Sequence, residues 1–315
     1  MPFTTEILRF DDAAIMRAAA VIANGLPVAI TSETVYGLAA DAGSGAAVAA
    51  IYAAKGRPSF NPLIVHVSDL AEAESLAIFD PVARRLAKEF WPGPLTLVLP
   101  LRADAPIATL ATAGLGTIGL RVPAHPAMRA LLAASGRPLA APSANKSGTI
   151  SPTRAEHVRQ SLGGRIPLII DAGPTSLGIE STIVSISEAG LFLLRPGPLT
   201  AEQLSQVTGM PVLEPVDSAI QAPGQLASHY APTKPLRLEA TQAESDEWLI
   251  GFGGIAGDVS LSPSGDLIEA AARLFDLLHE ADKQARSAIA VAPIPKEGLG
   301  FSINDRLQRA AAPRD

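Results

Sequence analysis

The sequence predicts an α/β fold in which a twisted open sheet of mixed or mostly parallel strands is followed by a smaller α/β unit. Strand-like apolar runs alternate with helix-like segments through about the first 200 residues, as in such sheets. Residues 211–235 are rich in proline and glycine and have no hydrophobic period, which is typical of a linker. We therefore expect a large domain over residues 1–210, a linker over 211–235 and a small domain over 236–315.

The elements of the large domain follow from hydrophobic periodicity and helix-capping residues. Residues 12–24 form a predicted helix that ends at Gly25, and residues 27–31 form a buried strand. A turn over residues 32–37 leads into an alanine-rich helix that ends at Lys55, and residues 63–67 form the next strand. Further strands are predicted at residues 95–99, 117–122, 138–141, 168–171, 181–186 and 191–195, and further helices at residues 82–90, 126–134, 153–162 and 200–209.

The small domain shows the same alternation on a smaller scale. Strands are predicted at residues 236–238, 248–250 and 287–291. A helix between the last two strands carries Leu267, Ala271, Leu274 and Leu278 on one face, and a last helix is predicted at residues 303–311. These elements predict a small Rossmann-like α/β domain.

The composition indicates a compact protein of the cytoplasm. Of the 315 residues, 48% are hydrophobic and 18% are charged, which argues against disorder. The net charge of -6 gives no general attraction for nucleic acids or anionic membranes, so any anion site must be local. The first residues lack the pattern of a signal peptide, and no apolar run reaches the ~18 residues of a membrane-spanning helix. We therefore expect no membrane partner.

Several kinds of site are excluded or weakly supported. The chain has no cysteine, which excludes thiolate nucleophiles, disulfides and cysteine-bound zinc or iron–sulfur centres. The five histidines show no metal-ligand spacing. His66, taken alone, has the sequence context of a hydrogen-bonded core residue. Glu33 would either act as a base or brace its turn.

The segment Lys55-Gly56-Arg57-Pro58 carries the most informative local motif. A lysine in a last helical turn complements the helix dipole by about 0.3 to 1 kcal/mol and needs no ligand. Gly56 and Pro58, however, fix the backbone on both sides of Arg57, so its planar guanidinium is held in place. A fixed guanidinium beside a lysine suits a polyanion such as the phosphate chain of a nucleotide.

Polar clusters lie where several predicted strands end. Ligands of open α/β sheets bind beyond the carboxyl ends of strands, so clusters distant in sequence can share one crevice. The clusters occupy residues 32–36, 55–61, 117–121, 143–151 and 179–182, together with Arg195. Their small residues let backbone amides approach phosphates, and three arginines and a lysine neutralise charge. Together they predict a site for a nucleotide and a second, small ligand.

These motifs resemble those of the YrdC-like threonylcarbamoyl-adenylate synthases, in the longer form that carries an extra C-terminal domain. The resemblance covers nearly the whole chain, and the order of its motifs is specific. The similar segments are residues 31–37, 55–58, 91–94, 141–148, 181–184, 195–197, 229–232 and 298–306. Residues 222–229 depart from the more basic linker that the family leads us to expect. The resemblance implies a YrdC-like open sheet in the large domain.

The resemblance also implies an ATP-dependent nucleotidyl transfer. L-Threonine and bicarbonate or CO2 would give N-carboxythreonine, whose carboxylate attacks the α-phosphate of ATP and releases pyrophosphate. The product, threonylcarbamoyl-AMP, would pass to a tRNA threonylcarbamoyl-transfer complex that modifies the adenosine next to the anticodon. Mg2+ would accompany ATP, and no metal site made of protein residues is implied.

The same resemblance implies roles for individual residues. Lys55 and Arg57 would be catalytic, since adenylyl transfer needs fixed positive charge near the reacting phosphate. L-Threonine would be bound by Thr34, His66, Arg121, Ala141 and Ser181. ATP would be bound by Arg57, Asn61, Thr117, Ser143, Ser151, Arg195 and Tyr230. Tyr230 belongs to the linker, which we expect to act as a lid that excludes water from the intermediate.

Two other functions are alternatives. A double-stranded-RNA or tRNA-binding module without catalysis would use a concave basic surface, but the acidic composition and the lack of aromatic platforms argue against it. A carbamoyl-adenylate-forming enzyme of metallocentre assembly would use an acceptor other than threonine, and the lack of cysteine-rich zinc segments argues against that function.

Overall fold

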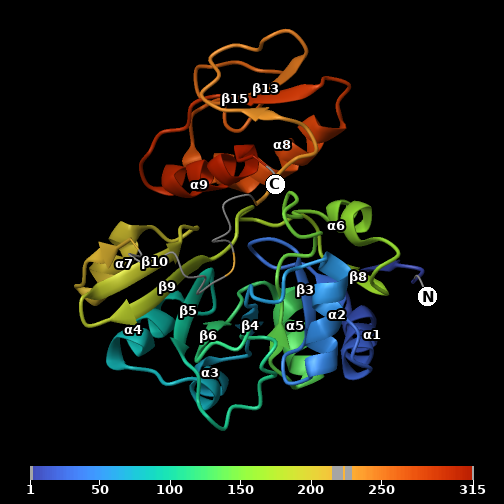
Figure 1. Ribbon diagram of the computed structural model, residues 1–315, viewed down its shortest axis with the longest axis vertical. Helices are drawn as coiled ribbons and strands as arrows, with labels where there is room; N and C mark the ends of the chain where they lie inside the picture. The colour runs from blue at the N-terminus through green and yellow to red at the C-terminus, as the bar shows by residue number, and fades with distance from the viewer. Residues whose placement is uncertain (1–2, 215–222, 224–228, 314–315) are drawn as a thin grey trace.

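The protein is described by a computed structural model that covers residues 3–214, 223 and 229–313. Within these residues the chain forms a larger domain with an 11-stranded sheet and a smaller domain with a 4-stranded sheet. Figure 1 shows the smaller domain stacked on the larger one. The predicted α/β class is confirmed. In the covered part of the chain, no helix is long and apolar enough to cross a membrane.

Strands and helices alternate along the larger domain. Its strands are β1 (Glu6–Arg9), β2 (Val28–Ile30), β3 (Gly37–Asp41), β4 (Ile64–His66), β5 (Leu95–Pro100), β6 (Thr117–Arg121), β7 (Leu139–Ala140), β8 (Leu168–Asp171), β9 (Thr182–Ser187), β10 (Gly190–Arg195) and β11 (Val212–Leu213). Its helices are α1 (Asp12–Ala23), α2 (Gly45–Lys55), α3 (Leu70–Leu76), α4 (Pro81–Phe90), α5 (Pro126–Ser135), α6 (Ala155–Leu162) and α7 (Ala201–Thr208).

The large sheet mixes parallel and antiparallel pairs, as predicted. Its strand order is β1-β8-β2-β3-β7-β4-β6-β5-β9-β10-β11. β4 runs parallel to β6, whereas β7 runs antiparallel to both β3 and β4. The register of the parallel pair places His66 opposite Arg121, the last residue of each strand. Two side chains that are far apart in sequence therefore reach the same edge of the sheet.

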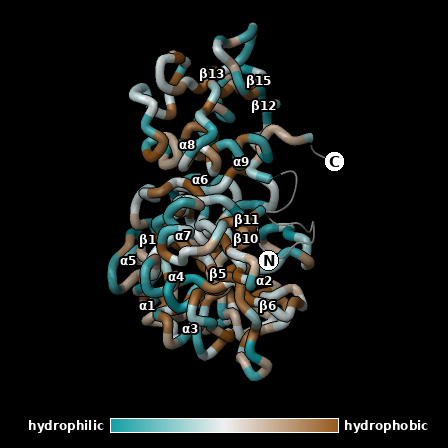
Figure 2. The backbone as a smooth tube through the Cα atoms, turned by 90° about the vertical axis from the view of Figure 1, so that its left-hand side faces the viewer, coloured by the Kyte–Doolittle hydropathy of each residue, from teal (hydrophilic) through white to brown (hydrophobic). Residues whose placement is uncertain are grey.

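Apolar side chains fill both faces of this sheet. On one face, helices α1 and α5 pack against the strands and against each other, with Ile22 and Met128 buried between them. On the other face, a larger cluster includes Val48 of α2 and Leu86 of α4. Figure 2 shows the hydrophobic colours concentrated inside the larger domain and the hydrophilic colours on its outer helices. The loops at the strand ends are thus held by a well-packed frame.

The structure corrects the predicted alanine-rich helix after residue 37. Residues 37–41 form strand β3, and helix α2 begins only at Gly45. Alanine favours a helix locally, but β3 pairs with β2 on one side and with β7 on the other, and all of its residues are buried. Pairing within the sheet overrides the local preference. Strands β1 and β11 and helix α3 are further elements that the sequence patterns did not predict.

The smaller domain contains a parallel sheet and two helices. Its strands β12 (Leu236–Arg237), β13 (Glu247–Gly251), β14 (Val259–Ser260) and β15 (Ala288–Val291) are arranged in the order β12-β15-β13-β14. Helices α8 (Leu267–Lys283) and α9 (Leu299–Ala311) lie between this sheet and the larger domain (Figure 1). Helix α9 begins at Leu299 rather than at the predicted residue 303. Most of the predicted linker, residues 215–222 and 224–228, lies outside the described residues.

The two domains are joined by apolar and polar contacts. Ile179 of the larger domain and Phe275 of α8 belong to one buried cluster. Beside it, Gly178 lies so close to α8 that a Cβ atom there would be 2.4 Å from a carbonyl oxygen of the helix. Arg154 donates two hydrogen bonds to Asp276 of α8, at 2.6 and 2.8 Å. The smaller domain therefore docks on the loop that precedes β9 and on the start of α6.

Candidate functional site

One cavity gathers the loops at the ends of several strands of the large sheet. Nine of the residues predicted for the site line it: Thr34, Arg57, His66, Arg121, Ala141, Ser143, Ser181, Arg195 and Tyr230. They come from the turn after β2, the segment after α2, the last residues of β4, β6 and β10, the loop after β7, the start of β9 and the linker. Residues predicted from the ends of separate strands therefore share one cavity.

Four predicted site residues do not line this cavity: Lys55, Asn61, Thr117 and Ser151. Thr117 is the first residue of β6 and Arg121 the last, so the two lie at opposite ends of the strand. Asn61 is 1% exposed, and neither polar atom of its side-chain amide has a hydrogen-bond partner among the described residues. Most buried polar side-chain groups are hydrogen-bonded, so the amide of Asn61 is an exception among the described residues.

Lys55 lies just behind the cavity wall. Its Nζ donates to the carbonyl oxygens of Ser143, at 2.5 Å, and Asn145, at 2.7 Å. Burial, and next the charge of Arg57, hold the pKa of Lys55 well below its usual value. In this structure the ammonium group supports the loop that carries Ser143, and its catalytic role stays a prediction.

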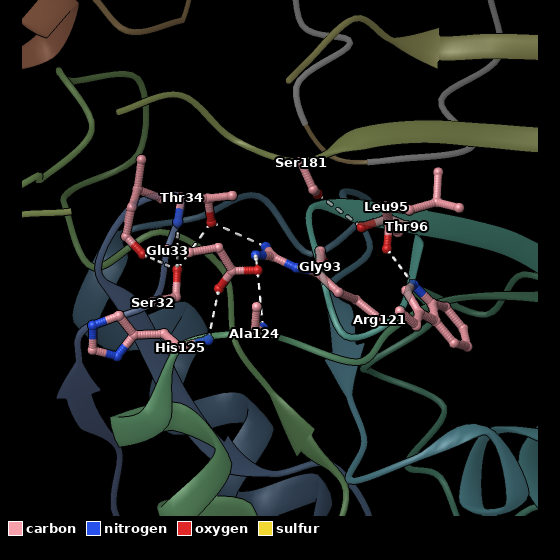
Figure 3. Close-up of polar contacts among 12 residues, drawn as sticks. Ser32, Glu33, Thr34, Gly93, Leu95, Thr96, Arg121, Ala124, His125 and Ser181 are labelled. Atoms are coloured by element: carbon pink, nitrogen blue, oxygen red, sulfur yellow. Dashed lines mark hydrogen bonds and ion pairs between the residues drawn. The ribbon is translucent and has the colours of Figure 1, made fainter. Parts of the chain in front are cut away.

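Arg121 is fixed in the cavity wall by three contacts, which Figure 3 shows. Its Nη2 lies 2.6 Å from Oε1 of Glu33. Nη1 donates to Oγ1 of Thr34 at 3.0 Å, and Nε donates to the carbonyl oxygen of Gly93 at 3.1 Å. A guanidinium has five N–H donors, so further donors remain for a ligand. The rigid mounting fixes the direction in which these donors point.

Glu33 braces this arrangement. Burial alone would raise the pKa of Glu33, but the charge and hydrogen bond of Arg121, with the backbone amide of Ala124, lower it to about 2. The amide of Ala124 donates to Oε1 at 3.1 Å, and that of His125 donates to Oε2 at 3.4 Å. Of the two roles left open by the sequence, these contacts fit the brace, because a carboxylate with so low a pKa is a weak base.

His66 lines the same part of the cavity and is neutral. Burial lowers its pKa to about 3, the charge of Arg121 acts in the same direction, and the charge of Glu33 opposes them. Its Nδ1 is buried and has no hydrogen-bond partner in the described part of the chain. An imidazole of this kind can give or accept one hydrogen bond at a defined position in the cavity.

Arg57 and Arg195 place two further guanidinium groups in the cavity wall. Arg57 donates to the carbonyl oxygens of Asn61, at 3.1 Å, and Pro62, at 2.9 Å. Arg195 donates to the carbonyl oxygen of Ser181, at 2.9 Å, and to its hydroxyl, at 3.0 Å. Burial lowers the pKa of Arg57 to about 10, so the group is still charged at neutral pH. Within the described residues, neither arginine has a carboxylate at ion-pair distance.

Tyr230 closes the cavity from the linker side. Its backbone adopts the left-handed conformation, with φ of 64°, which is uncommon for a residue other than glycine. Its ring packs against Phe275 of α8, with 5.4 Å between ring centroids. The hydroxyl is buried and has no partner among the described residues. The side chain is thus held by the smaller domain, while its hydroxyl has no hydrogen-bond partner in the part of the chain that the structure covers.

Among the described residues, the cavity offers no ready ligand set for a resident metal ion. In the part of the chain that the structure covers, no group of three or more His, Asp or Glu residues could hold one. Glu180 lines the cavity, but its carboxylate already contacts Ser151 and Arg306. The described residues of the cavity therefore do not supply a complete set of protein ligands for a divalent cation.

Comparisons with known proteins give the family. Residues 20–197 match the family described as "Telomere recombination", and residues 199–312 match "Threonylcarbamoyl-AMP synthase, C-terminal domain". The chain is 41% identical to the threonylcarbamoyl-AMP synthase of Bacillus subtilis, over 98% of this chain and 96% of the relative. The chain belongs to the threonylcarbamoyl-AMP synthase family. The synthase of Pyrococcus abyssi is 39% identical, over 97% of this chain and 96% of the relative.

Solved structures of this family share the whole architecture. The crystal structure of P. abyssi Sua5 complexed with L-threonine has a TM-score of 0.87 and 36% sequence identity, over 99% of this chain and 98% of that one. Both domains of the threonylcarbamoyl-AMP synthase family are therefore present here, and the predicted resemblance is confirmed. The agreement favours the synthase over the alternative of an RNA-binding module.

Two residues of this synthase-family site were not predicted from the sequence. Glu180 lines the cavity, and Arg306 of α9 holds it from the smaller domain. A signal for Arg306 was present: it lies between Ile303 and Leu307 on the buried face of a helix. A charged residue on such a face needs a buried partner of opposite charge. The sequence alone does not say that this partner is Glu180.

Proposed function

We propose that the chain synthesises threonylcarbamoyl-AMP and pyrophosphate from L-threonine, bicarbonate or CO2, and ATP. One observation carries this proposal: Arg57 and Arg195 are buried in one cavity wall, and no carboxylate of the described chain lies at ion-pair distance from either. Buried charges are normally paired, so the two guanidinium groups call for an anionic ligand. A nucleotide triphosphate supplies the required charge and oxygen acceptors.

The other side of the cavity suits an amino acid. The free donors of Arg121 can form two parallel hydrogen bonds with the carboxylate of L-threonine. Thr34, Ser181 and the unpartnered Nδ1 of His66 supply small polar contacts nearby. The backbone at Ala141 completes this side. We assign L-threonine to this end and the triphosphate to the end that contains Arg57 and Arg195, together with Ser143 and Tyr230.

The chemistry then needs two bond-forming steps. The uncharged amine of L-threonine attacks the carbon of CO2 and loses a proton, which gives N-carboxythreonine. A carboxylate oxygen of this intermediate attacks the α-phosphorus of ATP, and the bond to the β-phosphate oxygen breaks, so that pyrophosphate leaves with the electron pair. The fixed charges of Arg57 and Arg195 favour this step by lying near the phosphates before the reaction begins. Mg2+ would enter with ATP, held by phosphate oxygens.

The setting of the reaction belongs to the same proposal. Threonylcarbamoyl-AMP would be consumed in the cytoplasm by a tRNA threonylcarbamoyl-transfer complex, and an RNA contact would accompany that transfer. We also propose that the linker around Tyr230 excludes water from the intermediate. Supporting this, the buried Tyr230 ring lies at the cavity and is packed against the smaller domain.

The direct test is pyrophosphate release by the purified chain with ATP and Mg2+, leaving out L-threonine or bicarbonate in turn. We expect release that requires both, and a product whose mass is that of threonylcarbamoyl-AMP. Release that does not depend on L-threonine would point to another acceptor. No release, combined with RNA affinity that falls steeply with salt, would favour the RNA-binding module.

A further inference from the structure

Arg306 is a fully buried arginine that reaches from the smaller domain to the larger one. Its residue exposure is 0%, although it lies on helix α9, near the end of the chain. Nε donates to Oε2 of Glu180 at 3.0 Å, and Nη1 donates to the carbonyl oxygen of Pro196 at 2.7 Å. Nη1 also contacts Asp305 at 2.9 Å. One guanidinium thus fastens the segments before β9 and after β10 to the smaller domain.

Glu180 connects this contact to the cavity. Glu180 lines the cavity, whereas Arg306 does not. Its Oε1 accepts a hydrogen bond from Oγ of Ser151 at 2.5 Å, so the two carboxylate oxygens have different partners. The next residue, Ser181, holds Arg195 through both its carbonyl oxygen and its hydroxyl. The position of Glu180 therefore bears directly on the position of a cavity arginine.

Arg306 balances the buried negative charge of Glu180. Burial alone would raise the pKa of Glu180, but the charges of Arg306 and then of Arg195 lower it, so the carboxylate stays ionised. A buried carboxylate that lost Arg306 would need another cation. Arg195 is the other guanidinium whose field reaches Glu180, and it has no carboxylate at ion-pair distance in the described residues. Arg195 is also held by Ser181, the residue next to Glu180, so it is the guanidinium best placed to take over from Arg306.

We propose that Arg306 is a positioning residue of the synthase: it holds the Glu180 carboxylate away from Arg195, so that Arg195 stays available to the phosphates of ATP. The proposal rests on the proposed function, because it takes the anion at Arg195 to be the nucleotide. It also gives the smaller domain a role in the reaction. That domain supplies the charge that balances Glu180 and leaves the charge of Arg195 unbalanced.

Two other contacts of the smaller domain agree with this role. The guanidinium of Arg306 lies over the ring of Tyr230, 5.3 Å from its centroid, so the same group steadies the tyrosine that lines the cavity. From α8, Nε2 of His279 lies 3.1 Å from the carbonyl oxygen of Ser151, the partner of Glu180. The Ser151–Glu180 pair is thus held from two helices of the smaller domain.

The test uses the full chain with Arg306→Met, which keeps an unbranched apolar side chain and removes the guanidinium charge, and with Arg306→Met combined with Glu180→Gln. Affinity for ATP is measured by calorimetry, and KM and kcat by L-threonine-dependent pyrophosphate release. We expect Arg306→Met to weaken ATP binding at least about tenfold. We expect the double variant to recover most of this loss, because no carboxylate remains to pair with Arg195.

Controls separate the proposal from a loss of folding. Arg273→Met on α8 removes a partly exposed arginine that pairs with Glu269 in the same helix, and it should leave ATP affinity unchanged. Arg306→Lys keeps the positive charge, and it replaces Arg306→Met in the test if the methionine variant does not fold. Lysine has one nitrogen where arginine uses two different ones for Glu180 and Pro196, so it should hold Glu180 less firmly. ATP binding should therefore weaken, and Glu180→Gln should again restore it.

The outcomes are distinct. A double variant that binds ATP no better than its single parent would overturn the positioning role, and so would an Arg306→Met protein with unchanged affinity. ATP binding by calorimetry does not depend on turnover. If the parent chain binds ATP but releases no pyrophosphate with L-threonine, the proposed function fails while the effect of Arg306 on ATP binding is still measured.

Discussion

Glu33 and Arg121 form a buried ion pair at the cavity, with 2.6 Å between Oε1 and Nη2 and with both side chains less than a tenth exposed. The pair joins the turn after β2 to the last residue of β6. Glu33 also accepts backbone hydrogen bonds from Ala124 and His125, so it orders the start of α5 as well (Figure 3). Glu33 is the charged one of the three groups that fix the direction of Arg121, together with Thr34 and the carbonyl oxygen of Gly93.

Glu33→Gln should weaken L-threonine binding more than ATP binding. The amide keeps the shape of the carboxylate but leaves the buried charge of Arg121 without its partner, and breaking a buried pair costs about 3 to 5 kcal/mol when one side is removed. Because the glutamine amide keeps one hydrogen bond, we expect the free energy of unfolding, measured in urea, to fall by an amount at the low end of that range. The KM for L-threonine should rise at least about tenfold.

The matched control for Glu33→Gln is Glu74→Gln, since Glu74 pairs with Arg84 at the surface. Exposed ion pairs contribute about 0 to 1 kcal/mol to stability, so Glu74→Gln should change the free energy of unfolding and the KM for L-threonine very little. Equal effects of the two substitutions on L-threonine KM would contradict the bracing role of Glu33.

Lys55→Met should lower stability as well as activity. The ammonium donates to the carbonyl oxygens of Ser143 and Asn145, and buried groups left without partners cost about 1 to 3 kcal/mol each. We expect a loss of that size in the free energy of unfolding in urea, together with lower kcat. Lys146→Met, an exposed lysine in the same loop, is the control. A large fall in kcat with unchanged stability would show instead that Lys55 acts on the phosphates alone.

The domain interface should be sensitive to acid. His157 of α6 and His279 of α8 stack with 3.8 Å between ring centroids. Burial is the main reason that the pKa of His157 falls from 6.5 to about 3 and that of His279 to about 4. Lys283 also disfavours their protonation, whereas Asp276 opposes that effect.

The sign of the pH effect follows from these lowered values. Between pH 6.5 and about 4 the unfolded chain binds protons at these histidines that the folded chain does not, so the free energy of unfolding falls as the pH is lowered. Urea unfolding at a series of pH values measures this slope. His279→Gln keeps a donor for the Ser151 carbonyl and removes one titrating group, so its slope should be shallower. Identical slopes for the parent and the variant would refute this origin.

The sequence predicted most of the sheet because its strands are short apolar runs between clear turn and capping residues. It failed at β3, where an alanine-rich segment is buried between β2 and β7 and the pairing of strands decides its conformation. The site was predicted well where residues follow strand ends, as for His66 and Arg121 in adjacent parallel strands. This prediction did not require the order of the strands, because the carboxyl ends of parallel strands lie at the same edge of the sheet whatever their order.

The sequence could not predict contacts that depend on how elements pack. Lys55 has the position of a helix-terminal cation, yet its Nζ is turned inward to the carbonyl oxygens of another loop. Glu180 and Arg306 are far apart in the chain and meet only because the smaller domain docks on the larger one. Charge and periodicity show that such residues need partners, but the partner is set by the three-dimensional arrangement.

Tyr230→Phe should separate stability from ligand binding. The Tyr230 hydroxyl is buried without a partner in the described chain, and burying such a group is unfavourable. Its removal should therefore leave the unliganded protein as stable as before or slightly more stable, by up to about 1 kcal/mol. We also expect the hydroxyl to contact bound ATP. In that case Tyr230→Phe should raise the KM for ATP several-fold, and ATP should raise the melting temperature of the variant less than that of the parent.

Tyr36→Phe is the control for Tyr230→Phe, because its hydroxyl is also buried but satisfied. It lies 2.9 Å from a carboxylate oxygen of Asp171 and 2.8 Å from the carbonyl oxygen of Gly173, and Tyr36 does not line the cavity. Its loss should cost about 1 to 3 kcal/mol of stability and leave the KM for ATP unchanged. If Tyr230→Phe behaved in the same way, its hydroxyl would have a structural partner rather than a ligand. The opposite pattern in the two variants would assign the Tyr230 hydroxyl to the nucleotide.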